Sequence, residues 1–223
     1  GGLSPMKRIV LLVSTLVMLA AGCGLENGEL AFMASPRGSH LEAVTYRITL
    51  QPSGNLRVRM GAEFLDDEGG ILPIPKPLLG GVEDLRVNGQ PAQGSSEFET
   101  VNVPVTGREA VATFTITGAV KAGDDITTID TPLVASPSDA SRQDPPVDVR
   151  GVLVLPAGTP AADIDFHWIN GLDQDVSVKP AKVRFTGRSP IWTSSDLLVG
   201  LPPGLAPGVA GDFAALTSAS AFQ

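Results

Sequence analysis

The sequence predicts an all-β fold, a largely antiparallel β-sandwich, for residues 41–205. Three observations lead to this prediction. Several short segments alternate apolar and polar residues with a period of two. Clusters of Gly, Pro, Asn and Ser separate these segments at intervals of roughly 8–12 residues, which is typical of sandwiches. After residue 40 the sequence shows no convincing 3.6-residue apolar period of an amphipathic helix.

The clearest element is a hairpin over residues 41–64. Apolar residues occupy every second position from Val44 to Leu50 and again from Leu56 to Phe64. The Pro-Ser-Gly-Asn cluster at 52–55 separates the two runs and predicts a turn. Two alternating runs around such a turn predict an antiparallel pair with one buried face.

The next segments contain stronger turn and edge signals. Residues 71–77 have prolines at alternate positions, which excludes a central strand and predicts an edge strand or polyproline segment. Asn88-Gly89 predicts a tight turn. Residues 98–105 and 110–120 then predict two more strands.

The second half of the domain continues the same pattern. We expect a loop at 135–146 and a flexible or short helical tail at 206–223. The expected strands cover residues 147–155, 164–168, 176–178, 182–185 and 197–201. Short strands at this spacing predict a sandwich of the immunoglobulin-like or a related type.

The charge balance is acidic. The 223 residues contain 16 basic and 24 acidic side chains, a net charge of −8. Without residues 1–22, which include Lys7 and Arg8, the counts are 14 and 24 and the net charge is −10. Such a surface repels phosphate backbones and anionic headgroups, so we expect no nucleic-acid partner. The nearest approach to a basic cluster in the sequence is Arg57 with Arg59.

The N-terminus has the order of a secretory signal peptide over residues 1–22. Met6 is taken as the start, which makes residues 1–5 an upstream remnant. Lys7 and Arg8 precede an apolar run at 9–19, which is shorter than the about 20 residues that span a bilayer. Small residues then precede Cys23, the only cysteine, so the exported domain has no disulfide.

Leu19-Ala20-Ala21-Gly22-Cys23 resembles the bacterial lipobox. The resemblance implies covalent diacylglyceryl and N-acyl groups on Cys23, with residues 23–40 as a lipidated tether and no other cofactor. Several acyl chains are enough for stable anchoring. Because Gly rather than Asp follows Cys23, a Gram-negative host would sort the protein to the outer membrane, with the domain facing periplasm or exterior. The alternative is an ordinary cleaved signal with an incidental cysteine.

The mature chain also resembles the extracellular N-terminal module of a family of predicted bacterial membrane proteins of unknown function. The resemblance spans roughly 160 residues and implies a β-sandwich outside the membrane. Members of that family continue into transmembrane helices, whereas this sequence stops at Gln223. The stretches that carry the resemblance are Tyr46-Arg47-Ile48-Thr49-Leu50 with Ser53-Gly54-Asn55-Leu56, Phe114-Thr-Ile-Thr-Gly-Ala-Val120, Gly151-Val-Leu-Val-Leu-Pro156, and Leu197-Leu-Val-Gly-Leu-Pro-Pro-Gly204.

Four carboxylates form a weak candidate cation site. Asp163 and Asp165 alternate along a predicted strand with His167, and Asp173 and Asp175 follow across a turn. Calcium takes about six to eight oxygen ligands, more than either pair supplies alone. We therefore interpret the first pair as part of a solvated strand face and the second pair as an acidic turn. A calcium site is the less favoured interpretation.

Trp168 and Trp192 are candidates for stacking on a sugar ring, although core packing is the commoner role of tryptophan in such folds. No Gly-x-Ser-x-Gly elbow, phosphate-binding loop or zinc ligand set is present in the sequence, and we predict no catalytic residue.

The sequence therefore favours a membrane-anchored envelope lipoprotein whose sandwich binds a protein or envelope glycan without catalysis. Two alternatives stay open. One is a hydrolase of envelope polymers that uses Asp163, Asp165 and Asp173 as paired carboxylates. The other is an acyl-chain or lipid carrier with an apolar cavity.

Overall fold

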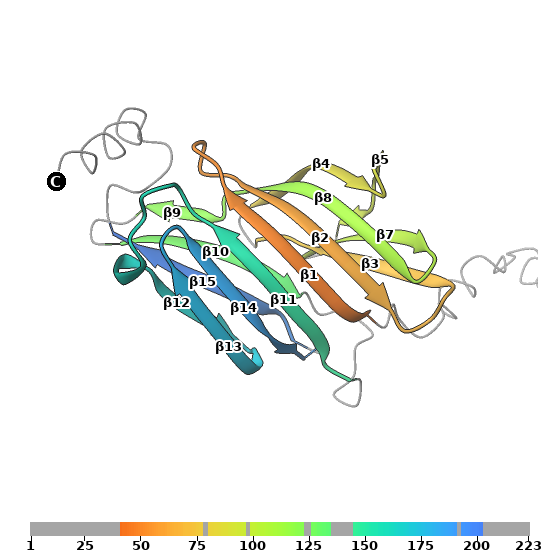
Figure 1. The fold of residues 1–223 in the computed structure, drawn as a ribbon. Coiled ribbons are helices and arrows are strands. Elements are labelled where there is room, and N and C mark those ends of the chain that lie inside the picture. Colours follow the sequence, from red (N-terminus) through yellow and green to blue (C-terminus); the bar gives the residue numbers. More distant parts are fainter. Residues whose placement is uncertain are drawn as a thin grey trace, which may run out of the picture. The chain divides into compact units, whose positions relative to one another are not determined.

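The computed structural model describes residues 41–77, 80–96, 99–122, 126–134, 145–190 and 193–202. The leader, Cys23 with its tether, Trp192 and the tail at 206–223 lie outside these ranges. Fifteen strands and one 3-10 helix occupy the described residues (Figure 1). Their bounds are β1 Leu41–Leu50, β2 Leu56–Phe64, β3 Gly69–Pro75, β4 Gly81–Val87, β5 Gln90–Pro91, β6 Ser95–Ser96, β7 Thr100–Thr106, β8 Glu109–Thr117, β9 Val120–Ala122, β10 Thr127–Val134, β11 Val147–Val154, η1 Ala161–Asp163, β12 Asp165–Ile169, β13 Leu172–Lys179, β14 Lys182–Ser189 and β15 Ser195–Leu201.

The strands form three sheets that make an all-β sandwich, as the sequence predicts. The large sheet has eight strands in the order β13-β14-β11-β1-β2-β8-β4-β5. A second sheet has the order β12-β15-β10-β9, and a third has the order β3-β7-β6. In the view of Figure 1 the large sheet lies in front of the other two. β10 of the second sheet lies beside β3 of the third.

The predicted hairpin at 41–64 is confirmed as β1 and β2. The two strands pair antiparallel from Leu50 opposite Leu56 to Ala43 opposite Glu63. Every second side chain of β2 is buried and those between are exposed or half-buried. The alternation therefore places the apolar side chains of β2 on the buried face of the sheet. Because a shift of one residue would expose them, this burial fixes the register of the strand pairing.

Two other local predictions are also confirmed. Asn88 and Gly89 have φ angles of 51° and 80°, as a type I′ turn requires, and join β4 to β5. The backbone N–H of Val111 donates a hydrogen bond of 2.9 Å to Asn88 Oδ1, which fixes this turn against β8. The proline-rich segment forms β3, an edge strand that pairs with β7 alone.

The described strands differ from the sequence prediction at several places. The segment 110–120, predicted as one strand, divides into β8 of the large sheet and β9 of the second, with a positive φ of 76° at Gly118 between them. β1 pairs with β11 in parallel, from Ala43 opposite Asp148 to Thr49 opposite Val154, whereas every other pairing is antiparallel. β10 was not anticipated at all. The last four residues of β10 are all buried, so this half of the strand lacks the alternation of a half-exposed strand. They include Pro132, and the pairing of β10 with β15 shifts register beside that proline.

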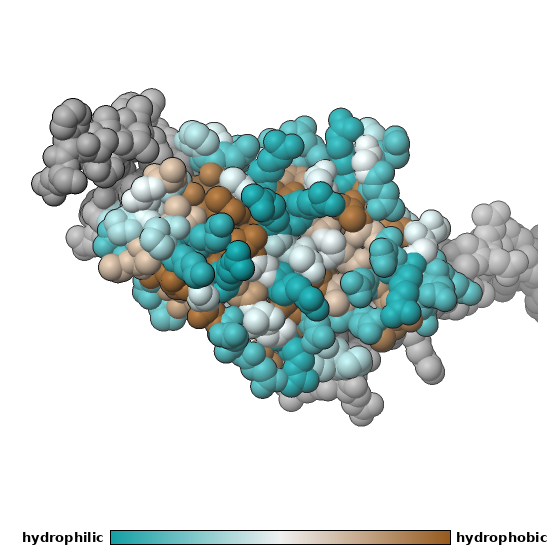
Figure 2. Space-filling view, in the orientation of Figure 1, coloured by the Kyte–Doolittle hydropathy of each residue, from teal (hydrophilic) through white to brown (hydrophobic). Residues whose placement is uncertain are grey.

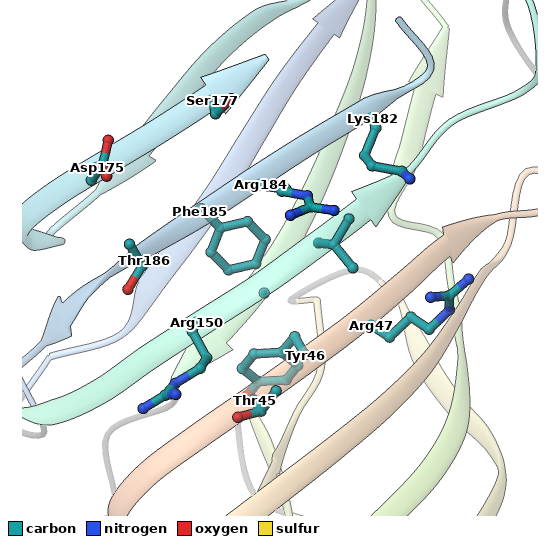
Figure 3. Close-up of a pocket in the computed structure, with 12 residues that line it drawn as sticks. Thr45, Tyr46, Arg47, Arg150, Asp175, Ser177, Lys182, Arg184, Phe185 and Thr186 are labelled. Atoms are coloured by element: carbon teal, nitrogen blue, oxygen red, sulfur yellow. The ribbon is translucent and has the colours of Figure 1, made fainter. Parts of the chain in front are cut away.

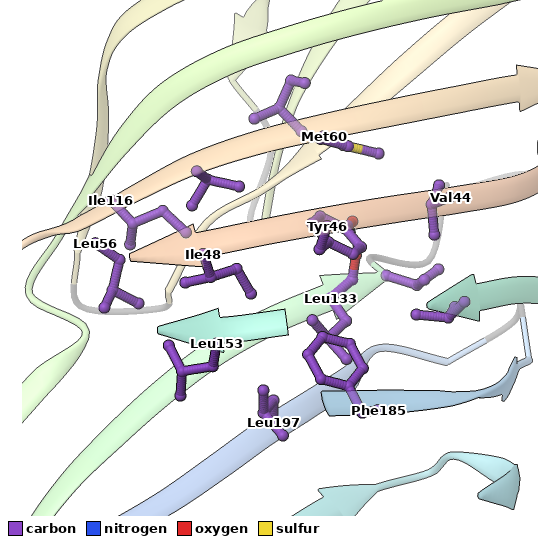
Figure 4. Close-up of a cluster of buried hydrophobic side chains, with 14 of the residues drawn as sticks. Val44, Tyr46, Ile48, Leu56, Met60, Ile116, Leu133, Leu153, Phe185 and Leu197 are labelled. Carbon is purple, nitrogen blue, oxygen red and sulfur yellow. Dashed lines mark hydrogen bonds between the residues drawn. The ribbon is translucent and has the colours of Figure 1, made fainter. Parts of the chain in front are cut away.

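One hydrophobic core joins the three sheets. It contains Ile48 of the large sheet, Ile129 and Leu197 of the second and Leu72 of the third, all fully buried. Figure 4 shows such side chains from the large sheet facing those of β10 and β15. The hydroxyl of Tyr46 donates a hydrogen bond to the carbonyl oxygen of Leu133, which links β1 to β10 across the core. The sandwich is thus held by apolar packing and by a buried polar link.

Candidate functional site: a basic face of the large sheet

The carboxylates that the sequence singled out do not converge. Asp163 lies in η1 and Asp165 begins β12, and both side chains are exposed. Asp165 Oδ2 lies 3.4 Å from His167 Nε2 on the same strand. Within the described ranges no group of three or more His, Cys, Asp or Glu side chains is arranged to hold a metal ion.

Asp173 and Asp175 lie on β13, in the large sheet, whereas Asp165 lies in the second sheet. Asp173 has a φ of 48° at a bulge in β13 and accepts hydrogen bonds from the Arg188 guanidinium, so its charge is already balanced. Asp175 is exposed and lines a surface depression described below. The two carboxylates therefore have separate surroundings.

Trp168 offers no face for sugar stacking, because it belongs to the core. Its side chain is 5% exposed and packs edge-on against Phe185, with the ring centroids 5.8 Å apart. Trp192, the other stacking candidate, lies outside the described residues.

The outer face of the large sheet presents a group of basic side chains that the sequence analysis missed. We call it the basic band and define it by seven residues of β1, β2, β11, β13 and β14. They are Arg47, Arg57, Arg59, Arg150, Lys179, Lys182 and Arg184. Six of the seven are exposed and Lys182 is half-buried. Figure 2 shows strongly hydrophilic side chains over this face, with apolar patches between them.

The strand register explains why these residues lie together. Arg184 stands opposite Val152, Val152 opposite Arg47, and Arg47 opposite Arg59, so they form one row across four strands. Residues two positions along a strand share its face, which adds Arg57 beside Arg59 and Lys182 beside Arg184. The buried residues between them, such as Ile48 and Val58, point into the core.

Part of the band surrounds a depression with a volume of about 500 Å³. Four of its twelve lining residues are basic, namely Arg47, Arg150, Lys182 and Arg184, and one, Asp175, is acidic. Figure 3 shows the basic side chains around the depression, drawn from β1, β11 and β14. Gly151, Tyr46 and Phe185 also line it. The depression is therefore concave and positively charged.

The basic side chains of the band are not ion-paired. Among the described residues, three ion pairs join Arg or Lys to a carboxylate, and none includes a member of the band, although the exposed Asp148 and Asp175 lie in the same sheet. Arg47 and Arg59 stand directly opposite each other on β1 and β2. Like charges in that position destabilise a sheet. Chemically, the arrangement suits an anion, because guanidinium groups bind phosphate and carboxylate oxygens in pairs.

A contrasting acidic group lies on the second sheet. Burial, together with the negative charges of Asp130 and Glu99, raises the pKa of Asp196 to about 6. Asp196 lies on β15 and Asp130 on the neighbouring β10. The Ser194 hydroxyl donates a hydrogen bond to Glu99. Asp196 and Asp130 thus place two carboxylates on neighbouring strands of the second sheet.

The sequence contained only a partial signal for the basic band. Alternation places Arg57 and Arg59 on one outward face of β2, and Arg47 on that of β1. The remaining four residues come from β11, β13 and β14, about 100 or more positions later in the chain. Nothing local to those strands indicates that β11 pairs with β1.

No family model matches the chain, and no curated protein matches it. Among solved structures, it is similar to the M1 zinc metallopeptidase from Deinococcus radiodurans, with 14% identity and a TM-score of 0.39 over 74% of this chain and 43% of that one. An aminopeptidase N family protein from Idiomarina loihiensis gives 12% identity and a TM-score of 0.37 over 70% of this chain and 29% of that one. This chain thus spans less than half the length of these proteins. A likeness this distant carries no conclusion about function.

Proposed function

We propose that this protein is exported, is anchored to a membrane by lipid on Cys23, and binds an envelope partner through its β-sandwich without catalysing a reaction. The lipobox resemblance of residues 19–23 supports the anchor. The partner is a protein or an envelope glycan. In a Gram-negative host the anchor would lie in the outer membrane, with the domain facing the periplasm or the exterior.

The single observation that carries the binding role is the basic band with its depression. Seven basic side chains lie on one face of a chain with an overall negative charge, and four of them surround a concave surface. An exposed charged face on a rigid sheet suits recognition of a partner of opposite charge. Where the structure describes the chain, no helix is long and apolar enough to cross a membrane.

Neither alternative function gains support from the geometry. A carboxylate-dependent hydrolase needs a cleft that holds two acidic groups within roughly 5–10 Å. None of the carboxylates predicted for the hydrolase, Asp163, Asp165 and Asp173, lines the depression. An acyl-chain carrier needs an apolar cavity between the layers, and that space contains the core cluster.

The test is crosslinking in cells of the native source, followed by affinity capture of the full chain and of Cys23→Ala. A discrete partner captured with both forms would place recognition in the sandwich. The lipid would then serve only to localise the protein at the membrane. Capture with the anchored form alone would make membrane attachment part of recognition. No saturable partner with either form would refute the binding role.

A further inference from the structure

We propose that the basic band binds an extended anionic glycan of the envelope, a polymer with a phosphate or carboxylate group on its repeating unit. This inference rests on the proposed binding role and names the chemistry of the partner.

The composition of the band favours these anionic groups. Five of its seven members are arginine. The arginine side chain presents a planar fork of donors that matches two oxygens of a phosphate or carboxylate, and it remains charged at any physiological pH. Because these side chains have no carboxylate partner among the described residues, an incoming anion would not have to displace one.

The shape of the band favours a polymer over a single small anion. The row from Arg184 through Arg47 to Arg59 crosses four adjacent strands, and Lys179 of β13 extends the band by a fifth. With neighbouring strands about 4.8 Å apart, the band is roughly 19 Å wide. A chain with charge along its length can contact several of these cations at once, which raises affinity through multivalency.

The same surface is poorly suited to a membrane. Peripheral membrane surfaces insert large apolar side chains beneath the headgroups. The exposed large apolar residues of the described chain are Leu65, Ile126, Ile169 and Leu172, and none belongs to the band or lines the depression. A concave depression also admits a polymer chain more readily than it admits the flat surface of a bilayer.

The band also lacks what single-stranded nucleic acid or a neutral sugar would use. Binding of unpaired bases and of sugar rings relies on exposed aromatic faces. The two aromatic residues that line the depression, Tyr46 and Phe185, are each 2% exposed. Recognition on this face therefore depends on charge and hydrogen bonding.

The experiment measures binding of the full-length protein, in detergent, to labelled phosphomannan and to labelled polygalacturonate, with neutral dextran as the blank. The test variant combines Arg47→Gln, Arg150→Gln and Arg184→Gln. The matched control combines Lys76→Gln, Arg108→Gln and Lys121→Gln. It also removes three positive charges, all at positions outside the five strands of the band.

We expect the wild type and the control variant to bind at least one anionic polymer, with affinity that falls as salt rises above about 0.1 M. We expect the band variant to bind about tenfold or more weakly, because three contacts along the polymer are lost. Free mannose 6-phosphate should compete only at far higher concentration than the polymer. Thermal unfolding of each variant checks that the fold is intact.

Three results would overturn the inference. They are an equal loss of affinity in both variants, binding of neither polymer by the wild type, and band-dependent binding only to phosphatidylglycerol vesicles. The last result would identify a membrane surface in place of a glycan. Failure of the proposed function is seen separately, as the absence of any crosslinked partner in cells. A partner captured equally by the wild type and the band variant would leave the function standing and refute the anionic glycan site.

Discussion

The aromatic ring of Phe185 occupies the space that a side chain at Gly151 would need. The two residues stand opposite each other on β14 and β11. A Cβ placed on Gly151 would lie 2.4 Å from Cζ of Phe185 and 2.8 Å from its Cε2. Glycine in the middle of this strand is thus required by a close approach of the neighbouring ring.

Gly151→Ala should destabilise the protein by about 1–3 kcal/mol, because the methyl group forces the Phe185 ring out of a packed position. Urea unfolding followed by circular dichroism measures the change. Gly61→Ala is the control, since a Cβ on Gly61 would meet no atom closer than 4.0 Å. That substitution in β2 should instead stabilise by about 0.5–1 kcal/mol. Equal effects of the two substitutions would contradict the role of Phe185.

The link between Tyr46 and Leu133 gives a second prediction. The hydroxyl is fully inside the sandwich, and burial raises the pKa of Tyr46 far above its usual value, so it remains a neutral donor. Tyr46→Phe removes the donor and leaves the buried Leu133 carbonyl without it. We expect a loss of about 1–2 kcal/mol in the free energy of unfolding.

Chemical denaturation of the full chain at neutral pH measures this loss. The apolar ring is retained in Tyr46→Phe, so the change in buried area is small and the denaturant slope should stay constant. An unchanged midpoint would mean that the hydrogen bond contributes nothing to the joining of β1 and β10.

Asp196 should make stability depend on pH between about 4 and 6. Its folded pKa of about 6 exceeds the ordinary value of 3.8. The folded protein therefore binds the proton more tightly than the unfolded chain. The contribution is fully present below about pH 4 and is lost as the pH rises through 6. Because Asp196 is only half-buried, solvent screening limits its size.

Asp196→Asn should remove this part of the pH dependence. Compared with wild type, the variant should gain stability as the pH rises from about 4 to 7. Unfolding midpoints of both proteins in urea, measured at stepped pH, give the difference. The difference at about pH 3 isolates any packing effect, since the carboxyl is then mostly neutral in both the folded and the unfolded wild type. A difference that is the same at every pH would contradict the assignment.

The opposed pair Arg47 and Arg59 gives a further prediction. Arg59→Gln should raise the free energy of unfolding by about 0.2–1 kcal/mol at low salt, because it removes a like-charge cross-strand contact. The gain should shrink at about 1 M salt, where the screening length is about 3 Å. Thermal unfolding at the two salt concentrations measures it.

Arg57→Gln is the matched control on the same strand. Arg57 stands opposite Thr49 on one side and Thr115 on the other, so no charge directly opposes it. Arg57→Gln should therefore show no comparable gain in the free energy of unfolding. Equal gains in both variants would indicate a general effect of charge on the sheet.

Local sequence signals were sufficient for the elements that depend on neighbouring residues. The alternation over 41–64 predicted β1 and β2, because burial of one face needs only a period of two. Asn88-Gly89 predicted a turn that requires positive φ at both residues, and the alternate prolines predicted that β3 lies at an edge. By contrast, β10 was missed because it is buried on both sides along its second half and contains Pro132.

The sequence by itself determined an all-β sandwich with a defined hairpin, turn and edge strand. Only the tertiary structure decided that β11 lies beside β1, since these strands are about 100 residues apart and their pairing has no local signal. That pairing brings Arg150 and Arg184 next to Arg47 and assembles the basic band in an acidic chain. Net charge is a property of composition, but the grouping of these basic side chains depends on which strands become neighbours.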